Sequence, residues 1–188
     1  RLLKKSDESF CNVTSFIVNI ASVTPSSRFE IAPTVHPANP PKEIAVMLLA
    51  GFAALMGLSF AVIFAVYTMA SIFSAFMGAA VLFGTMSFYG YFTKKDLDSL
   101  GKFMFVGLIA IVIASIVNIF IGSTVMQMVI SALAIIIFLG LTAYDTQKIR
   151  EEVSYETNGV AEVRGALTLY MDFINLFINL LQLFGDRK

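Results

Sequence analysis

The sequence predicts an all-α integral membrane protein, a polytopic helical bundle with about five spans. Hydrophobic residues make up 57% of the 188 residues and charged residues only 14%, whereas soluble domains have about 45–50% and about 25%. No Asp, Glu, Lys or Arg occurs in residues 44–92 or in residues 103–144. Each tract is about twice the 20 residues that a membrane-spanning helix requires, so each predicts a helical hairpin. Apolar runs of this length exclude a transmembrane β-barrel, whose strands alternate in polarity.

Residues 1–43 are predicted to be a polar N-terminal tail, and residues 44–188 the membrane bundle. The tail holds all five prolines, and its mildly apolar stretch at residues 10–23 is too short to span a bilayer and is interrupted by polar residues, which argues against a cleaved signal sequence. The single cysteine, Cys11, and the single histidine, His36, also lie here, so we expect no intrachain disulfide and no Cys/His metal cluster. A net charge of zero gives no electrostatic reason to expect nucleic acid as a partner.

Five apolar segments follow the tail, and the spans are predicted at residues 44–67, 70–92, 103–121, 125–144 and 166–184. Uncharged turns join the first pair and the second pair, whereas basic residues gather in the loops at residues 94–102 and 148–164. By the positive-inside rule these two loops are cytoplasmic and both turns are external. The sequence leaves open whether the last segment crosses the membrane or re-enters it.

The last apolar segment carries an acid, Asp172, at membrane depth. At 100° per residue, five polar side chains share one arc of about 80°, namely Thr168, Asp172, Asn175, Asn179 and Gln182. Because hydrocarbon does not solvate a carboxylate, we expect this stripe to face the bundle interior or to line a water-filled pore. The alternative is a helix lying flat on the membrane surface, but such helices carry Lys and Arg on the polar face.

A second acid, Asp145, stands at the predicted cytoplasmic end of the fourth span. One interpretation is that it simply meets water and Lys148 or other basic neighbours at a helix end. The other is that the fifth segment enters from the same side, so that Asp172, one to two turns deep, lies level with Asp145. Two facing carboxyl groups in a low dielectric do not easily both ionise, so the pair would share one proton and its charge would follow pH. Asp145 and Asp172 are therefore the predicted pH sensor and gate.

Three motifs at these positions carry a family resemblance. They are FGTMSFYGYFTKKDL at residues 83–97, GLTAYDTQ at residues 140–147 and ALTLYMDFINLF at residues 166–177. In this order they resemble the Bax inhibitor-1 family, the transmembrane Bax inhibitor motif proteins, over about residues 44–188, and the first resembles the bacterial branch. Residues 1–43 do not resemble the family's first two spans, so the arginine that family members set against the acids has no assigned counterpart.

The resemblance implies a fold, a function and a location. The fold would be seven transmembrane helices, the last surrounded by the others, in a bacterial inner membrane. The function would be a slow, pH-sensitive calcium leak whose two-aspartate sensor corresponds to Asp145 and Asp172. No bound cofactor or resident metal is expected, since calcium would be the transported ion and the lipid bilayer the other partner.

Two other functions compete with the leak. One is a non-conducting protein that modulates membrane quality control or stress survival through contacts with other membrane proteins. The other is an intramembrane aspartyl protease, because two aspartates lie on adjacent spans and Tyr144 precedes Asp145. Those proteases pair Tyr-Asp with Gly-x-Gly-Asp, whereas Leu-Tyr-Met precedes Asp172, so no enzymatic activity is predicted.

Overall fold

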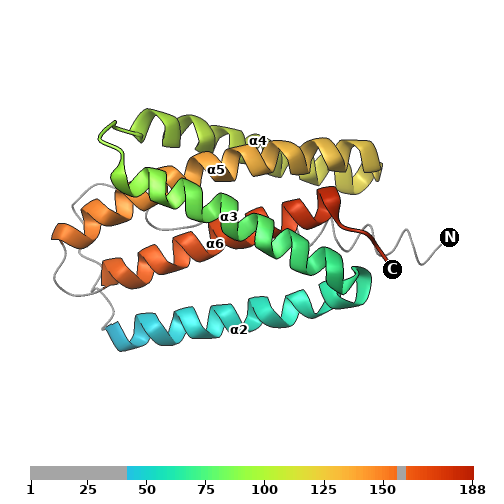
Figure 1. The fold of residues 1–188 in the computed structure, drawn as a ribbon, viewed down its shortest axis with the longest axis horizontal. Helices are drawn as coiled ribbons and strands as arrows, with labels where there is room; N and C mark the ends of the chain where they lie inside the picture. Colours follow the sequence, from blue (N-terminus) through green and yellow to red (C-terminus); the bar gives the residue numbers. More distant parts are fainter. Residues whose placement is uncertain (1–41, 156–159) are drawn as a thin grey trace.

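The computed structural model describes residues 42–155 and 160–188. They form a bundle of helices (Figure 1), namely α2 (Lys42–Val66), α3 (Met69–Phe92), α4 (Asp98–Ile121), α5 (Thr124–Tyr155) and α6 (Val160–Phe184). These ranges contain no β-strand, which confirms the predicted all-α class. The predicted polar tail lies, except for its last two residues, outside the described part of the chain.

Four of the helices are long and apolar enough to cross a membrane: α3, α4, α5 and α6. The remaining helix, α2, has 25 residues and carries no charge after Glu43. Short turns at residues 67–68 and 122–123 separate the helices of the two predicted hairpins. The polytopic helical bundle is therefore confirmed, and α2 as a fifth span stays a prediction.

Local sequence signals set the two tight turns. Thr68 caps the N-terminus of α3 with extended backbone, and its hydroxyl oxygen accepts a hydrogen bond of 3.3 Å from the backbone N–H of Ser71. Gly122 ends α4 in the left-handed conformation at a φ of 68°, and its N–H donates to the Asn118 carbonyl oxygen over 2.7 Å. Glycine occupies this conformation without the steric penalty that other residues carry.

The predicted loop at residues 148–164 is wrong in extent, because most of it is helix. The α5 helix continues to Tyr155 and α6 begins at Val160. The residues involved are rich in Glu, Arg and Lys, which favour helix, and Ile149 lies against Gly165 of α6. A helix of 32 residues is about 48 Å long. It therefore extends beyond a hydrocarbon core of about 30 Å, and α4 likewise begins at Asp98, before its predicted start at residue 103.

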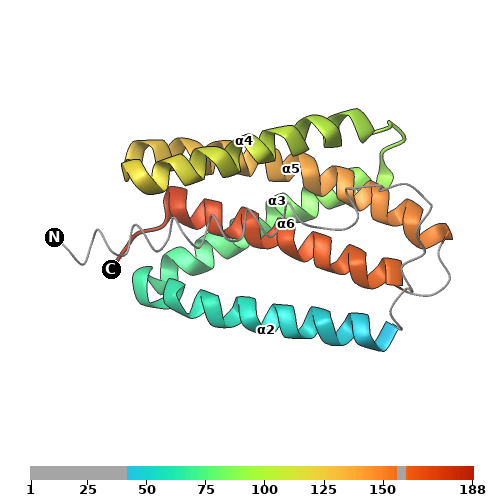
Figure 2. The same cartoon turned by 180° about the vertical axis from the view of Figure 1, so that it is seen from behind.

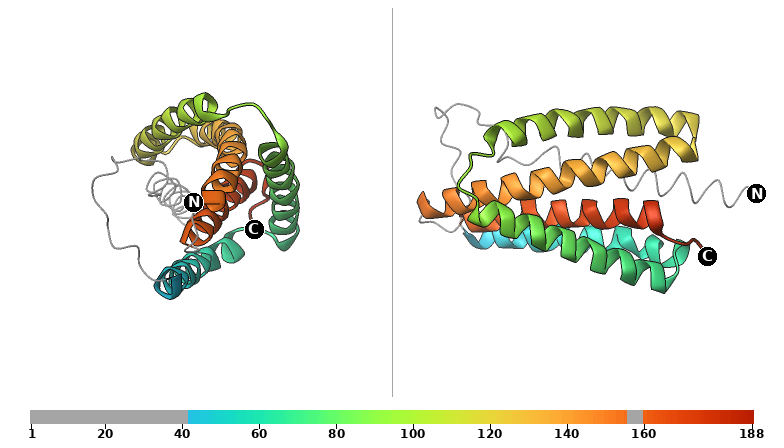
Figure 3. Two further views of the ribbon diagram at one scale, coloured as in Figure 1. Left: turned by 90° about the vertical axis from the view of Figure 1, so that its left-hand side faces the viewer. Right: turned by 45° about the horizontal axis from the view of Figure 1, so that its top comes forward.

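The last helix occupies the centre of the bundle. It packs against α5, α3 and α2, and the view along the bundle shows it inside the arc of the other helices (Figure 3). In its most apolar window 61% of the residues are buried, against 17–33% in α3, α4 and α5. The predicted central position of the last helix is thus confirmed.

The C-terminal residues show that α6 runs the full length of the bundle. After α6 ends, the last residues of the chain lie against the turn between α2 and α3 (Figure 2). The backbone N–H of Thr68 donates to the Asp186 carbonyl oxygen over 3.1 Å, and the N–H of Lys188 donates to the Val66 carbonyl oxygen over 3.0 Å. The Asp186 N–H donates to the Ser71 hydroxyl over 2.9 Å. The last segment therefore crosses the bundle and does not re-enter, and its tail lies at the end opposite the α3–α4 loop.

Candidate functional site

The polar stripe of α6 lies inside the bundle. Thr168 is 5% exposed, Asn175 1%, and Asp172 and Asn179 are fully buried at 0%. The opposite side of the helix is covered by neighbouring helices, and Phe173 makes edge-to-face contacts with Phe76 and Phe83 of α3. A buried stripe is incompatible with a helix lying flat on the membrane surface, so that alternative is excluded.

In two amide side chains of the stripe the nitrogen donates a hydrogen bond but the oxygen accepts none among the described residues. The Nδ2 group of Asn175 donates to the Met171 carbonyl oxygen over 2.9 Å, and that of Asn179 donates to the Asn175 carbonyl oxygen over 2.8 Å. Both Oδ1 atoms are buried and accept no hydrogen bond among the described residues. A buried acceptor without a partner costs about 1–3 kcal/mol, so these two oxygens are candidate ligands for a water molecule or a cation.

Asp145 is buried as well, at 3% exposure. It is not at a helix end, because α5 continues for ten residues beyond it to Tyr155. A narrow crevice of about 10 Å³, roughly one water molecule in size, runs between α5 and α6 beside Asp145. Its walls are Tyr144, Asp145, Lys148, Ile149, Glu152, Gly165 and Thr168.

This crevice brings Asp145 to the polar stripe. Thr168 shares the crevice with Asp145 and lies one helical turn before Asp172 on the same face of α6. Gly165 allows the close approach, because an added Cβ would lie 2.6 Å from the Ile149 side chain. Asp145 therefore does not face bulk water at a helix end, although Lys148 lines the same crevice, and both acids lie at the α5–α6 interface.

Gln182 differs from the rest of the stripe. Its Oε1 atom accepts hydrogen bonds from Gln127 Nε2 over 2.7 Å and from Ser131 Oγ over 3.0 Å. The Nδ2 group of Asn118 donates in turn to Gln127 Oε1 over 3.1 Å. The sequence reading missed Asn118, Gln127 and Ser131. The sequence could have indicated them, because polar side chains inside a charge-free apolar tract need hydrogen-bond partners within the bundle.

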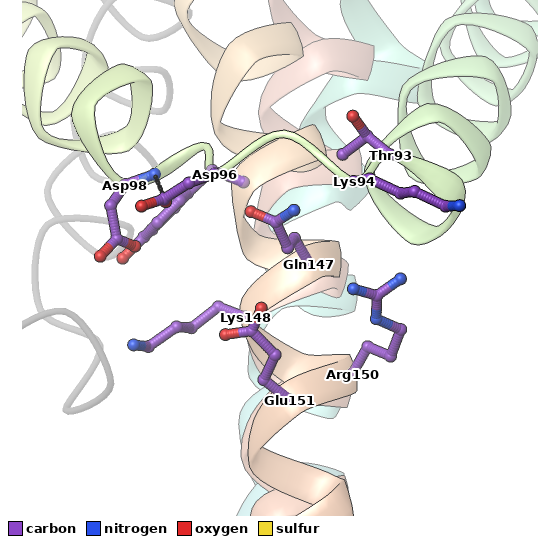
Figure 4. A pocket seen from close by; sticks show the side chains of 9 residues that line it. Thr93, Lys94, Asp96, Asp98, Gln147, Lys148, Arg150 and Glu151 are labelled. Carbon is purple, nitrogen blue, oxygen red and sulfur yellow. Dashed lines mark hydrogen bonds between the residues drawn. The ribbon is translucent and has the colours of Figure 1, made fainter.

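A polar pocket of about 290 Å³ lies at the other end of the bundle, between the α3–α4 loop and α5 (Figure 4). Gln147 points from α5 toward this loop. Its Oε1 accepts from the Leu97 N–H over 3.0 Å, and its Nε2 donates to the Lys95 carbonyl oxygen over 2.9 Å. Arg150 donates to the Tyr91 carbonyl oxygen and lies 5.7 Å from the centre of the Tyr91 ring. Gln147 therefore holds the basic loop against α5, and Arg150 holds the end of α3.

Comparison with known proteins shows which family the chain resembles. The chain matches the family described as "Inhibitor of apoptosis-promoting Bax1" over residues 10–188, so the match begins well before residue 44, where we expected the likeness to start. It is 46% identical over 153 residues to the inner membrane protein YbhL of Escherichia coli K12, which covers 77% of this chain and 64% of YbhL. It is 44% identical over 151 residues to a membrane protein of Streptococcus pyogenes serotype M3, with 78% and 65% covered.

A protein of Deinococcus radiodurans is 40% identical over 148 residues, again with 77% of this chain and 64% of the relative covered. The chain thus spans a little under two thirds of the length of these relatives. The four apolar helices and the likeness to an inner membrane protein identify a multi-pass protein of a bacterial inner membrane. With a family match that takes in nearly the whole sequence, the chain belongs to the Bax inhibitor-1 family.

Proposed function

We propose that the protein is a pH-sensitive leak pathway for calcium and related cations, gated by Asp145 and Asp172. The observation that carries this proposal is the burial of both acids at one helix interface, at 3% and 0% exposure. Acidic residues inside membrane helices are rare, because they are costly there, and they usually mark ion or proton pathways. Two such acids on the two neighbouring helices α5 and α6 favour a functional pair.

The sensing step follows from the chemistry of paired carboxyl groups. In a low dielectric, two nearby carboxylates repel each other strongly, so the pair would bind and release a shared proton as one unit. Protonation changes the charge of the α5–α6 interface and therefore the free energy of helix arrangements that place water beside it. The crevice beside Asp145 would give that proton a way in from the side of the α3–α4 loop.

The ion would follow the polar face of α6. Hard cations such as Ca²⁺ take oxygen ligands, including amide carbonyl oxygens. The Oδ1 atoms of Asn175 and Asn179 are of this kind and accept no hydrogen bond among the described residues. In this proposal they replace part of the ion's hydration shell between the acid pair and Gln182.

Flux through liposomes tests the proposal. Purified protein would be reconstituted with a calcium indicator trapped inside, and calcium entry would be followed between about pH 5 and about pH 8. Protein-free liposomes control for passive leak, and a calcium ionophore shows that the dye responds. We expect a slow, protein-dependent influx that changes with pH.

The same assay weighs the alternative function. If folded protein leaves the trapped indicator unchanged at every pH, the leak proposal is wrong. The non-conducting protein that acts through contacts with other membrane proteins would then be favoured.

A further inference from the structure

The polar face of α6 changes character along its length. At Asn175 and Asn179 the amide oxygens accept no hydrogen bond among the described residues. One turn further on, Gln182 Oε1 accepts two hydrogen bonds from α5. The amide oxygens of the stripe therefore accept no side-chain hydrogen bond in its middle, whereas at its end Gln182 is bonded to side chains of α5.

Four uncharged residues from three helices make this closure. Gln127 and Ser131 lie one turn apart on α5 and both donate to Gln182 of α6. Asn118 of α4 donates to Gln127 and also accepts a hydrogen bond of 3.2 Å from the backbone N–H of Ser123. Asn118 and Ser131 are 0% exposed and Gln127 is 8% exposed. We call Asn118, Gln127, Ser131 and Gln182 the amide cluster.

The amide cluster lies at the end of the bundle far from Asp145. Asn118 is in the last turn of α4, Gln127 in the first turn of α5 and Gln182 in the last turn of α6. In Figure 1 these three helix ends meet where the α4–α5 turn and the C-terminus lie. The crevice beside Asp145 lies toward the opposite end of the bundle. Asn175 and Asn179 therefore lie between this crevice and the amide cluster.

We propose that the amide cluster is a second closure of the pathway, at its external mouth, and that it opens by exchanging its side-chain hydrogen bonds for hydrogen bonds to water. This inference rests on the proposed function, since it assigns a gate to the same route. Each neutral hydrogen bond contributes only about 0.5–1.5 kcal/mol net. Opening therefore has a modest free-energy cost, because amides and hydroxyls that part from one another can bond to entering water.

This closure would not respond to pH. No charged residue occurs in residues 103–144 of α4 and α5. The next charged residues after the cluster, Asp186 and Arg187, follow the end of α6 and lie against the α2–α3 turn. The Asp186 N–H donates to Ser71, and Arg187 lies 5.9 Å from the centre of the Tyr67 ring. The acid pair would therefore set the pH dependence, and the amide cluster would set how far the external mouth is open.

Chemical accessibility of the buried stripe tests the inference without depending on calcium transport. In a Cys11→Ser background, Asn179→Cys places a single thiol between the acid pair and the amide cluster. A membrane-impermeant thiosulfonate reagent would be added on the side of the α4–α5 turn. Gln127→Ala removes the bond to Gln182 and the bond from Asn118, so we expect the thiol to react roughly tenfold faster.

Two further variants keep the test interpretable. Met128→Leu is the matched control, because Met128 is the neighbour of Gln127 but is 48% exposed on the lipid side. Ser131→Ala removes a single donor to Gln182 and should give a smaller acceleration, which protects the test if Gln127→Ala fails to fold. Equal reaction rates in Gln127→Ala, Ser131→Ala and Met128→Leu would overturn the inference.

Calcium flux in Gln127→Ala, Ser131→Ala and Met128→Leu, each made with Asn179 intact, separates the two proposals. Faster thiol reaction together with higher flux and an unchanged pH midpoint supports both the leak and the amide cluster. Faster thiol reaction without calcium flux at any pH would overturn the leak and leave the amide cluster as the closure of a polar cavity. Flux that depends on pH, with thiol reaction unchanged, would overturn the amide cluster alone.

Discussion

Single side chains on α6 were predictable from the sequence, whereas the acid on α5 was not. The arc shared by Thr168, Asp172, Asn175 and Asn179 required them to face inward, and all four are buried. Asp145 fitted two interpretations, because a charge at the end of an apolar run suits both water and the protein interior. The structure places Asp145 in the protein interior, because α5 continues to Tyr155 and residues of α6 line the crevice beside Asp145.

Asn179→Leu tests the proposed ion route at the residue scale. Leucine has a similar volume but offers no oxygen ligand, so calcium flux should fall severalfold while its pH dependence stays, because the acid pair is untouched. The measurement is indicator flux in liposomes over the pH range used for the wild type. Phe184→Leu, at a residue 72% exposed, is the control. Wild-type flux in Asn179→Leu would show that the ion does not pass this amide.

Gly90 tests how closely α3 approaches α5. An added Cβ would overlap the backbone carbonyl oxygen of Ala143, whereas one at Gly84 would meet nothing within 4 Å. Because backbone cannot yield as a side chain does, Gly90→Ala should lower the free energy of unfolding by about 1–3 kcal/mol, and Gly84→Ala should not. Thermal unfolding in detergent measures this, and equal midpoints for the two variants would contradict the packing described here.

At the scale of elements, the apolar runs located each helix of the described part of the chain, but charged residues led to wrong positions for several helix ends. Charged residues end a predicted membrane span, so a run of them is interpreted as a loop. In water, however, Lys, Arg, Glu and Gln favour helix, and the helix can continue past the membrane. The same limit hid the amide cluster. Gln127 and Gln182 are 55 residues apart in sequence, and the local sequence around either residue does not predict that the two are in contact.

The loop between α3 and α4 should depend on Gln147. Gln147→Ala removes the acceptor of the Leu97 N–H and the donor to the Lys95 carbonyl oxygen. Loss of one buried hydrogen bond corresponds to roughly a tenfold rise in local opening, so amide hydrogen exchange at Leu97 should accelerate about tenfold. Glu151→Ala, at an exposed residue of the same pocket, is the control. Unchanged exchange in Gln147→Ala would mean that the loop is held by other contacts.

At the scale of the whole molecule, the helix order puts the turns at residues 67–68 and 122–123 with the C-terminus at one end, and the α3–α4 loop with the end of α5 at the other. The basic residues Lys94, Lys95, Lys102, Lys148 and Arg150 belong to the second end. By the positive-inside rule we expect this end to be cytoplasmic. Asp145 would then sense cytoplasmic pH, and the amide cluster would face outward.

Cysteine labelling of intact cells tests this orientation. In a Cys11→Ser background, Thr124→Cys should react with an impermeant thiol reagent from outside, and Ser154→Cys should react only after the cells are opened. Both native residues are exposed side chains at opposite ends, so differences in burial do not confound the comparison. External labelling at position 154 without labelling at position 124 would invert the proposed membrane orientation.

The central claim is that Asp145 and Asp172 act together as the pH sensor of a calcium leak. The most direct measurement is calcium flux against pH for Asp172→Asn, Asp145→Asn and the double variant, each shown to be folded by its unfolding midpoint. Asparagine keeps the shape and removes the titration, so each single variant should lose pH dependence, and the double variant should be little worse because the two residues act as one unit. Full wild-type pH dependence in Asp172→Asn would contradict the account.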